Sequence, residues 1–529
     1  MKEFSIVIRN GRIIDGSGNP WFKGDVGIDG DRINRVGNLG QFEAESEIDA
    51  KELFVCPGFI DVHSHSDVSF FVNQKADSKI TQGVTSEIVG NCGHSAAPIT
   101  ELGKTFYAKG YEEKGIDWNW STVAEYLKQL EDQGIPLNVG TLIGHGNIRA
   151  SVMGYDDRNP TLEELESMKK LVEEGMRDGA FGISTGLKYA PGCYAKTDEI
   201  VELCKVVQRY GGIYATHIRN QGDFLIESID EAIEIGRRSG VPIQISHLKS
   251  KGRSNWGKAR NMLRIISEAR VSGVDVTFDQ YPYLAGQSNL ISRAPSWARE
   301  GGPECLLERL KDPKQRKMIE VEIPKSEDWH GPENTIIAGF APNRSYEGKS
   351  LKELGNIRDQ TPESVVCNLL LESEGVVPVV SFYGWEKDIR DIMTHHAMMV
   401  GSDGSSLAPY GVLGRGKPHP RSYGCFSRFL GRYVLKEGLL NVEEGVRRTT
   451  YFPARRFGLL DRGLLRKNMF ADLLIIDAEK VVDVATFEDP HKYSKGIEYV
   501  LINGKMVIKN GNFTGILAGK TLKHVIYNN

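Results

Sequence analysis

Cys56-Pro57-Gly58-Phe59-Ile60-Asp61-Val62-His63-Ser64-His65-Ser66-Asp67 is an apolar run that ends in two histidines separated by one residue. The apolar part predicts a buried strand over Phe54–Val62. Because side chains two residues apart on a strand point to the same side, both imidazoles can reach one cation. The stretch therefore predicts a strand that ends at a metal. On its own, His-x-His is equally typical of a polar loop. The choice between a metal site and a loop therefore depends on the motifs in the rest of the chain.

Short apolar runs alternate with amphipathic helical patterns through the middle of the chain. The helices we predict include Thr161–Arg177, Thr197–Tyr210 and Phe224–Ser239. This alternation is typical of βαβ units around a parallel sheet, and eight such units fit a (β/α)8 barrel of the TIM type. The eight predicted strands are Phe54–Val62, Thr85–Val89, Leu137–Ile143, Ala180–Ser184, Gly212–Ala215, Ile243–Ile245, Val274–Phe278 and Ala397–Val400.

Both ends of the chain carry short β-rich runs that are separated by Asn-Gly and Asp-Gly turn signals. Each set is too small to fold alone, so we predict one small, antiparallel, β-sandwich-like domain assembled from both termini. Between strands 7 and 8 the chain is much longer than one βα unit needs, which predicts an insertion that faces the active site or, alternatively, decorates the far surface. The predicted segments are an N-terminal β part (1–54), barrel strands 1 to 7 (55–283), an inserted subdomain (284–370), the end of the barrel (371–460) and a C-terminal β part (461–529).

The composition of the 529 residues is that of an ordinary globular protein, with 40% hydrophobic and 26% charged residues. A formal net charge of −4 and a pI near 6.4 give no sign of a nucleic-acid or membrane partner. No apolar run approaches the length of a membrane span, and the start of the sequence does not resemble a signal peptide, so we predict a cytoplasmic location. Seven scattered cysteines do not indicate a disulfide framework. The oligomeric state stays open.

Residues capable of metal chemistry follow the predicted strands. Active sites in barrels of this kind lie at the carboxyl ends of the strands. Imidazole, thiolate and carboxylate ligands suit zinc, and a catalytic zinc site keeps a position open for water, which suits hydrolysis. The alternatives are core histidines with ordinary hydrogen bonds and, for Asp403, an ordinary aspartate in an Asp-Gly turn. The residues at the strand ends are His63 and His65, Cys92, His145, His217, His247 and Asp403.

Taken together, these motifs resemble the amidohydrolase superfamily, and within it the N-acyl-D-amino-acid deacylases (D-aminoacylases). The resemblance extends over nearly the whole chain. It rests first on Val62-His63-Ser64-His65, on single histidines at the ends of strands 5 and 6, and on Ser402-Asp403. The more specific motifs are Gly90-Asn91-Cys92-Gly93, the run from Ser184 to Gly192, Thr216-His217-Ile218-Arg219, Ser246-His247-Leu248-Lys249, Asp279-Gln280-Tyr281-Pro282-Tyr283 and Pro418-His419-Pro420-Arg421.

The resemblance implies roles for individual residues. Cys92, His217 and His247 would hold one tightly bound Zn²⁺, and His63 and His65 would form a second, weaker metal site. A carboxylated lysine bridges two metals in many members of the superfamily. Here strand 4 ends without a lysine, which agrees with Cys92 in the bridging place, although Lys188 follows a few residues later.

The resemblance also assigns the substrate-facing groups. Asp403 would be the general acid and base, and Lys249, Arg421 and Tyr189 would hold the α-carboxylate of the substrate. A guanidinium pairs bidentately with a carboxylate and an ammonium adds a point charge, so the cations fit that role. Ordinary surface charges, and a packing role for Tyr189, are the alternatives.

The implied reaction is zinc-dependent hydrolysis of an N-acyl-D-amino acid to a free D-amino acid and a carboxylic acid. The preference for D substrates comes from the resemblance alone. The alternatives are hydrolysis of cyclic amides, N-carbamoyl amino acids or dipeptides on the same metal site, and an inactive fold that serves as a binding module. Retention of every predicted ligand together with Asp403 argues against the inactive fold.

Overall fold

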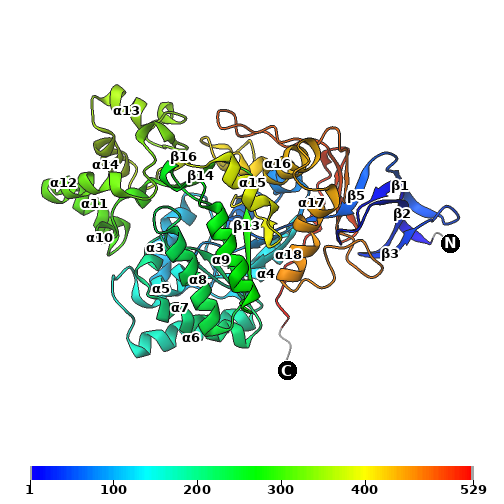
Figure 1. Cartoon of the computed structure of the whole chain (residues 1–529), viewed down its shortest axis with the longest axis horizontal. Coiled ribbons are helices and arrows are strands. Elements are labelled where there is room, and N and C mark those ends of the chain that lie inside the picture. Colours follow the sequence, from blue (N-terminus) through cyan, green and yellow to red (C-terminus); the bar gives the residue numbers. More distant parts are fainter. Residues whose placement is uncertain (1–2, 526–529) are drawn as a thin grey trace.

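Parallel strands form the centre of the computed structural model, which describes residues 3–525 (Figure 1). They lie in a six-stranded sheet with the order β17-β13-β12-β11-β10-β9 and a three-stranded sheet with the order β6-β7-β8. β8 runs almost directly into β9, and Ser64 after β6 forms a parallel bridge with Gly404 after β17, so the two sheets continue into one TIM-barrel-like domain. The strands are β6 (Phe59–Asp61), β7 (Val84–Val89), β8 (Asn138–Thr141), β9 (Ile143–Gly144), β10 (Gly182–Gly186), β11 (Ile213–His217), β12 (Ile243–Ile245), β13 (Val276–Gln280) and β17 (Met398–Val400).

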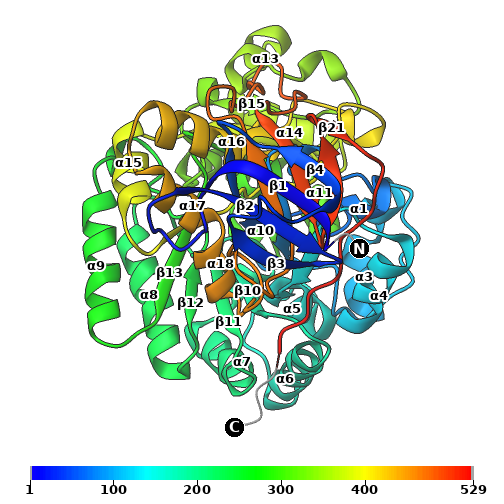
Figure 2. The ribbon, with the colours of Figure 1, turned by 90° about the vertical axis from the view of Figure 1, so that its right-hand side faces the viewer.

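Helices surround these strands, and Figure 2 shows α4 to α9 arranged around the periphery of the domain. The three helices that the sequence predicts are present within one residue at each end. Thr161 caps α6, and its side chain and that of Glu164 form a reciprocal capping box. The helices are α1 (Ser69–Val72), α2 (Asp77–Ile80), α3 (Glu101–Glu112), α4 (Val123–Gln133), α5 (His145–Met153), α6 (Leu162–Arg177), α7 (Thr197–Arg209), α8 (Leu225–Ser239), α9 (Ala259–Val271), α15 (Glu386–Thr394), α16 (Arg421–Arg428), α17 (Val442–Thr449) and α18 (Tyr451–Arg456).

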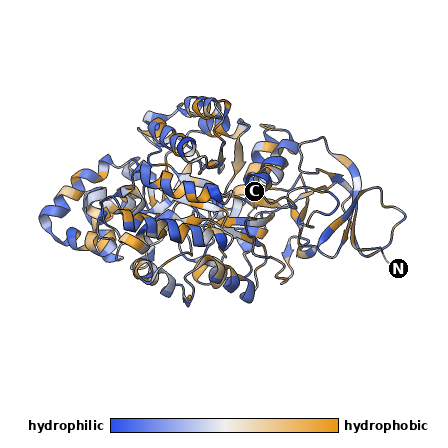
Figure 3. Ribbon diagram, turned by 90° about the horizontal axis from the view of Figure 1, so that it is seen from below, coloured by the Kyte–Doolittle hydropathy of each residue, from blue (hydrophilic) through white to orange (hydrophobic). Residues whose placement is uncertain are grey.

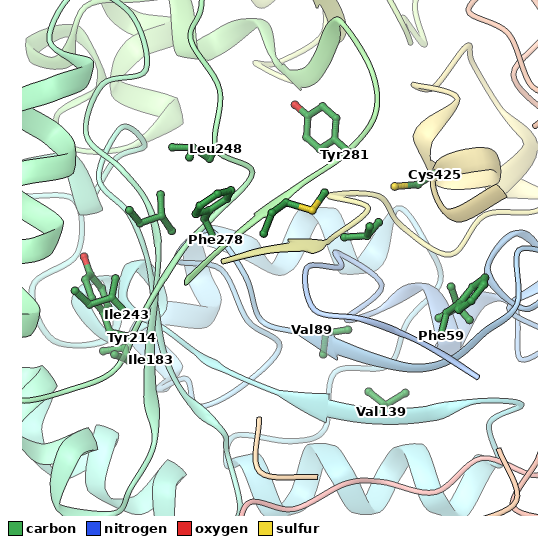
Figure 4. Close-up of a cluster of buried hydrophobic side chains, with 14 of the residues drawn as sticks. Phe59, Val89, Val139, Ile183, Tyr214, Ile243, Leu248, Phe278, Tyr281 and Cys425 are labelled. Atoms are coloured by element: carbon green, nitrogen blue, oxygen red, sulfur yellow. The ribbon is translucent and has the colours of Figure 1, made fainter. Parts of the chain in front are cut away.

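Outer helices such as α6 are apolar on one face, and Figure 3 shows both hydropathy colours along the same helices. In α6 the buried side chains Met168, Val172 and Met176 recur every four residues and so lie on one face. Side chains from successive strands, among them Val139 and Ile243, gather in the main hydrophobic core (Figure 4). Between residues 3 and 525, no helix is both long and apolar enough to cross a membrane.

The apolar run before His63 belongs to two sheets, so our prediction of one strand over Phe54–Val62 is wrong. The chain divides at Gly58: β5 (Phe54–Pro57) joins the terminal sheet, and only β6 joins the barrel. A Cβ at Gly58 would lie 2.1 Å from the side chain of Thr85, so a glycine is needed at this close approach. The backbone N–H of Gly58 also donates to the carbonyl of Asp472 in the C-terminal segment, with 2.9 Å between nitrogen and oxygen.

Both chain ends contribute to a single nine-stranded sheet, at the opposite end of the molecule from the helices α10 (Ser296–Arg299) to α14 (Pro362–Glu372) (Figure 1). Its order is β21-β20-β19-β18-β5-β1-β2-β3, with β4 also paired to β1. The prediction of a purely antiparallel domain is wrong, because β1 pairs in parallel with β4 and β5 after the chain crosses the sheet. The terminal strands are β1 (Phe4–Ile13), β2 (Phe22–Asp29), β3 (Arg32–Gly37), β4 (Ala44–Asp49), β18 (Leu473–Ile476), β19 (Ile497–Ile502), β20 (Lys505–Lys509) and β21 (Asn512–Phe513).

The segment between strands 7 and 8 has its own sheet and its own hydrophobic cluster. The antiparallel strands lie in the order β14-β16-β15, and the cluster draws on residues from Leu290 to Val379. The third strand lies beyond residue 370, where we predicted the insertion to end; the segment boundaries themselves stay a prediction. The elements of the insertion are β14 (Ala285–Asn289), α10 (Ser296–Arg299), α11 (Pro303–Lys311), α12 (Pro313–Glu322), β15 (Thr335–Ile337), α13 (Leu351–Arg358), α14 (Pro362–Glu372) and β16 (Pro378–Phe382).

Candidate metal centre

The predicted metal ligands converge at the carboxyl ends of the barrel strands. Potential ligand atoms form two overlapping groups, and within each group the atoms all lie within 4.8 Å of one another. All the residues in them are buried except His65, whose side chain is 29% exposed. The first group is His63, His65, Cys92 and Asp403, and the second is Cys92, His217 and His247.

Cys92 lies at the centre of both groups. Its sulfur is 3.3 Å from His63 Nε2, 3.5 Å from His247 Nε2 and 3.6 Å from His217 Nδ1. Burial alone would raise the pKa of the Cys92 thiol, but the charge of His63 and the hydrogen bonds from His63 and His65 lower it. A lowered pKa favours the thiolate, which is the form that binds a metal.

The histidines of the second group are held neutral. Burial, followed by the charges of Lys251 and Lys249 for His217 and of Lys249 for His247, lowers the pKa of both histidines well below the usual value. A neutral imidazole keeps a lone pair for a metal. Sulfur, nitrogen and carboxylate oxygen atoms that converge in this way match the ligands of zinc, so the residues fit the implied metal.

The backbone is strained at three of the site residues. Cys92, His247 and Asp403 have φ angles of 53°, 37° and 50°, in the left-handed region that side-chain-bearing residues avoid. Such conformations cost about 1–3 kcal/mol each and tend to occur at functional sites. They turn the side chain of each residue into the mouth of the barrel immediately after its strand.

Asp403 links the first ligand group to a cation. Its Oδ1 lies 3.0 Å from His65 Nε2 and 3.6 Å from His63 Nε2, and its Oδ2 lies 2.7 Å from a guanidinium nitrogen of Arg421. Burial raises the pKa of this carboxyl, but Arg421 and His247 outweigh it and hold the pKa well below the usual value. Asp403 is therefore ionised at neutral pH.

Asp279, near the end of β13, supports the ligands from below. Its Oδ1 lies 3.1 Å from His63 Nδ1 and accepts the backbone N–H of His247 at 2.8 Å, while Oδ2 accepts from Gln244. A carboxylate behind a metal-ligating histidine fixes the tautomer and orientation of the ring. The sequence places this aspartate at a strand end, but we predicted no role for it.

A buried lysine, which sequence reasoning missed, ties together the loops that carry the ligands. Lys79 Nζ lies 2.8 Å from Asp61 Oδ2 and 3.1 Å from Glu87 Oε1. It also donates to Ser402 at 2.8 Å and to Ser64 at 3.3 Å, residues next to Asp403 and between the two histidines. Lys79 lies on the four-residue helix α2, and no local pattern in the sequence distinguishes it.

A cavity of about 750 Å³ opens onto the metal centre. The predicted substrate-binding residues Lys249, Arg421 and Tyr189 all line it. Lys249 has no hydrogen-bond or ion-pair partner among residues 3–525, and its ammonium lies 5.0 Å from the centre of the Tyr281 ring. Burial and the charge of Lys251 lower the pKa of Lys249 well below that of a free lysine. The ring of Tyr189 packs edge-on against His217, with 4.9 Å between ring centres.

The inserted segment supplies one wall of this cavity, through residues such as Ser288, Ser292 and Ser381. The alternative of an insertion remote from the site is therefore wrong. Two residues that we considered lie elsewhere: the side chain of His145 is buried against Glu199, 2.8 Å away, and Lys188 pairs with Glu327 of the insertion at 2.8 Å. Lys188 is thus engaged away from the place of a metal-bridging lysine.

The profile of the Amidohydrolase family matches residues 46–319 and 370–508. The chain is 36% identical to the D-aminoacylase of Alcaligenes xylosoxydans xylosoxydans over 98% of this chain and 97% of that protein. The chain belongs to the amidohydrolase family. Its resemblance to the D-aminoacylases, expected from the motifs, is confirmed, and the protein is a metal-dependent amidohydrolase.

Two further similarities place this amidohydrolase more closely. It is 35% identical to the N-acyl-D-glutamate deacylase of the same organism, over 95% of this chain and 93% of that one. A solved structure of N-acyl-D-glutamate deacylase from Bordetella bronchiseptica, in complex with zinc and a phosphonate inhibitor that mimics the tetrahedral intermediate of the reaction, superposes with a TM-score of 0.83. It is 32% identical and covers 98% of this chain and 99% of its own.

Proposed function

We propose that this amidohydrolase hydrolyses the amide bond of N-acyl-D-amino acids to give a D-amino acid and a carboxylic acid. The observation that carries the proposal is the position of Lys249, which has no hydrogen-bond or ion-pair partner in the described part of the chain, in the same cavity as the candidate metal ligands. A substrate with an amide near a carboxylate would fit both parts of the cavity. Lys249 and Arg421 would bind its carboxylate, and its acyl carbonyl would lie at the metal ligands. The relatives named for D-aminoacylase and N-acyl-D-glutamate deacylase act on substrates of this kind.

We propose zinc as the metal. Cys92, His217 and His247 would hold one ion tightly, and His63 and His65 a second, weaker one. When bound, zinc polarises a carbonyl and lowers the pKa of water toward 7. The donor set of one thiolate and several imidazoles supports this choice over a hard cation such as Mg²⁺, which prefers oxygen ligands.

Asp403 is the proposed general base and acid. As an ionised carboxylate at the mouth of the cavity, its Oδ1 can take a proton from the attacking water and return it to the amine nitrogen as the C–N bond breaks. Arg421 and Lys249 orient the substrate, and Tyr189, packed on His217, closes the pocket beside the carboxylate. Together these groups perform hydrolysis without a covalent intermediate on the protein.

The finer architecture and the cellular setting are also proposals. We propose that the parallel strands close into an eight-stranded barrel, and that the terminal sheet curls into a sandwich around its own core. Alternation in β18 supports the sandwich, because Leu473 and Ile475 pack in the terminal core while Leu474 and Ile476 pack in the main one. The cytoplasmic location and the absence of a nucleic-acid partner stay predictions.

Amine release from paired N-acetyl-D- and N-acetyl-L-amino acids, measured with the zinc content of the same sample, tests the function. We expect release from the D series only, from protein that carries about one tightly held zinc per chain. Zinc-loaded protein that turns over cyclic amides or N-carbamoyl compounds and neither acetyl series would contradict the proposal.

A further inference from the structure

Two adjacent acidic residues of the insertion, Glu327 and Asp328, contact the loops around the metal centre. Glu327 Oε2 accepts the backbone N–H of Gln221 at 2.9 Å. Asp328 Oδ1 lies 3.1 Å from Lys251 Nζ, and both acidic residues pair with Lys188. Their side chains are only 6–11% exposed. One short segment of the insertion therefore holds the loops that follow β10, β11 and β12.

Gln221 connects this segment to a metal ligand. It is fully buried, and its side-chain amide nitrogen lies 3.2 Å from His247 Nδ1, while His247 Nε2 faces the Cys92 sulfur. The backbone of Gln221 is held on both sides, since its carbonyl accepts the N–H of Lys251 at 2.8 Å and its N–H donates to Glu327. The residue has little freedom to move away from His247.

The amide of Gln221 also has an unused acceptor. Its Oε1 is buried and has no hydrogen-bond partner within residues 3–525. The oxygen and nitrogen of a side-chain amide are interchangeable by a flip, and the hydrogen-bonding network decides which orientation is adopted. A histidine that binds a metal through Nε2 carries its proton on Nδ1. After the flip, the Gln221 oxygen would accept a hydrogen bond from that N–H group.

We propose that Gln221, anchored by Glu327 of the insertion, is a positioning residue that fixes His247 for metal binding. The inference rests on the metal centre of the proposed function. Metal-ligating histidines commonly donate their other N–H to an outer acceptor, and loss of that acceptor costs about 10- to 100-fold in metal affinity. For His63 the acceptor, Asp279, comes from the barrel itself. For His247 the acceptor is Gln221, which is held in place by Glu327. Glu327 lies outside the residues that the family profile matches.

The test is the zinc affinity of the full-length chain, measured by competition with a chromophoric chelator. Gln221→Met keeps the size but removes the acceptor, and we expect it to bind zinc about 10- to 100-fold more weakly. Gln221→Glu keeps an acceptor and should bind zinc nearly as tightly as the unsubstituted chain. Glu327→Ala should weaken binding in the same direction by a smaller factor.

The double variant Gln221→Met/Glu327→Ala decides whether Glu327 acts through Gln221. If it does, the double variant binds zinc no more weakly than Gln221→Met alone; independent effects would multiply instead and overturn the anchoring role. Asp472→Asn, which breaks a buried ion pair outside the cavity, controls for lost stability. Unchanged affinity in Gln221→Met, or an equal loss in the control, would overturn the inference.

Zinc affinity also separates this inference from the reaction. A chain that binds zinc but releases no amine from acyl amino acids would contradict the proposed function while leaving the role of Gln221 open to the same measurement. A chain that binds no zinc would overturn both.

Discussion

Two buried aspartate–arginine pairs lie in different regions of this protein and serve different ends. Asp472 and Arg462 lie where the terminal sheet meets the barrel, and each also bonds Asn503; Asp472 accepts from Asn138 as well. Asp403 and Arg421 lie at the mouth of the barrel, beside a cavity that Lys249 also lines. The first pair is closed within the fold, whereas the second faces the space where a ligand would bind.

The difference shows where buried charge stabilises and where it is kept for chemistry. A buried pair that lacks further partners is costly, so complete hydrogen bonding is typical of a structural role. The strained φ of Asp403 and the lowered pKa of Lys249 add cost at the barrel mouth. Such local costs are typical of functional sites. Substitutions in the two regions should therefore separate activity from stability.

The largest effect on turnover is expected from Cys92→Ala. This change removes the sulfur that both ligand groups share, so zinc affinity should fall by more than the roughly 100-fold that the loss of an outer partner costs, and hydrolysis should reach background. Cys204→Ala is a matched control, because Cys204 is equally buried but lies on α7. Zinc analysis of both variants checks the prediction; equal zinc content in both would contradict it.

Asp403→Asn should come next. The amide cannot accept the proton, so kcat should fall by about 10²- to 10⁴-fold, the usual contribution of a general acid or base. The ligands around Cys92 remain, so the tightly bound zinc should stay. Turnover numbers together with metal content test this. A variant that keeps most of its turnover would remove Asp403 from the reaction.

Much of the candidate site could be predicted because its residues are fixed to strand ends. His217 ends β11, and His63 and His247 follow β6 and β12 by two residues, so any sequence that reveals the strands also places these side chains at one edge. The motif Gly90-Asn91-Cys92-Gly93 likewise reflects geometry, since a Cβ at Gly93 would lie 2.6 Å from the backbone of Gly186. Local pattern and global position agree at these points.

The remaining features depend on contacts between distant segments, which local pattern does not encode. The division at Gly58 arises because two sheets compete for one apolar run, and the pairing of β5 with β1 and β18 reveals it. Lys79 acts through Asp61 and Ser402, the latter 323 residues away. Glu327 lies in the insertion, 106 residues from Gln221. The periodicity of strands and helices carries no information about such pairs.

Lys249 should give the site a pH dependence that sharpens the comparison. The carboxylate of the substrate needs the ammonium form, and the lowered pKa of Lys249 means that this form is lost as the pH rises, at a pH below the ordinary value of 10.5. KM for an N-acetyl-D-amino acid should therefore rise on the alkaline side, by about 10-fold or more once the charge is lost. Lys249→Arg, whose guanidinium stays charged, should move that rise to higher pH. If the pH at which KM rises does not change in this variant, the rise belongs to the titration of another group.

Asp472→Asn should have the smallest effect on turnover and the largest on stability. Removing the carboxylate leaves Arg462 buried without a counter-charge, which costs about 3–5 kcal/mol in the free energy of unfolding. The pair lies at the junction with the terminal sheet rather than in the cavity, so kcat, KM and zinc affinity should be unchanged below the unfolding temperature. Denaturant titration and steady-state kinetics on the same sample measure both quantities. Loss of activity without loss of stability would show that the junction communicates with the metal centre, and the two kinds of buried pair would then be alike.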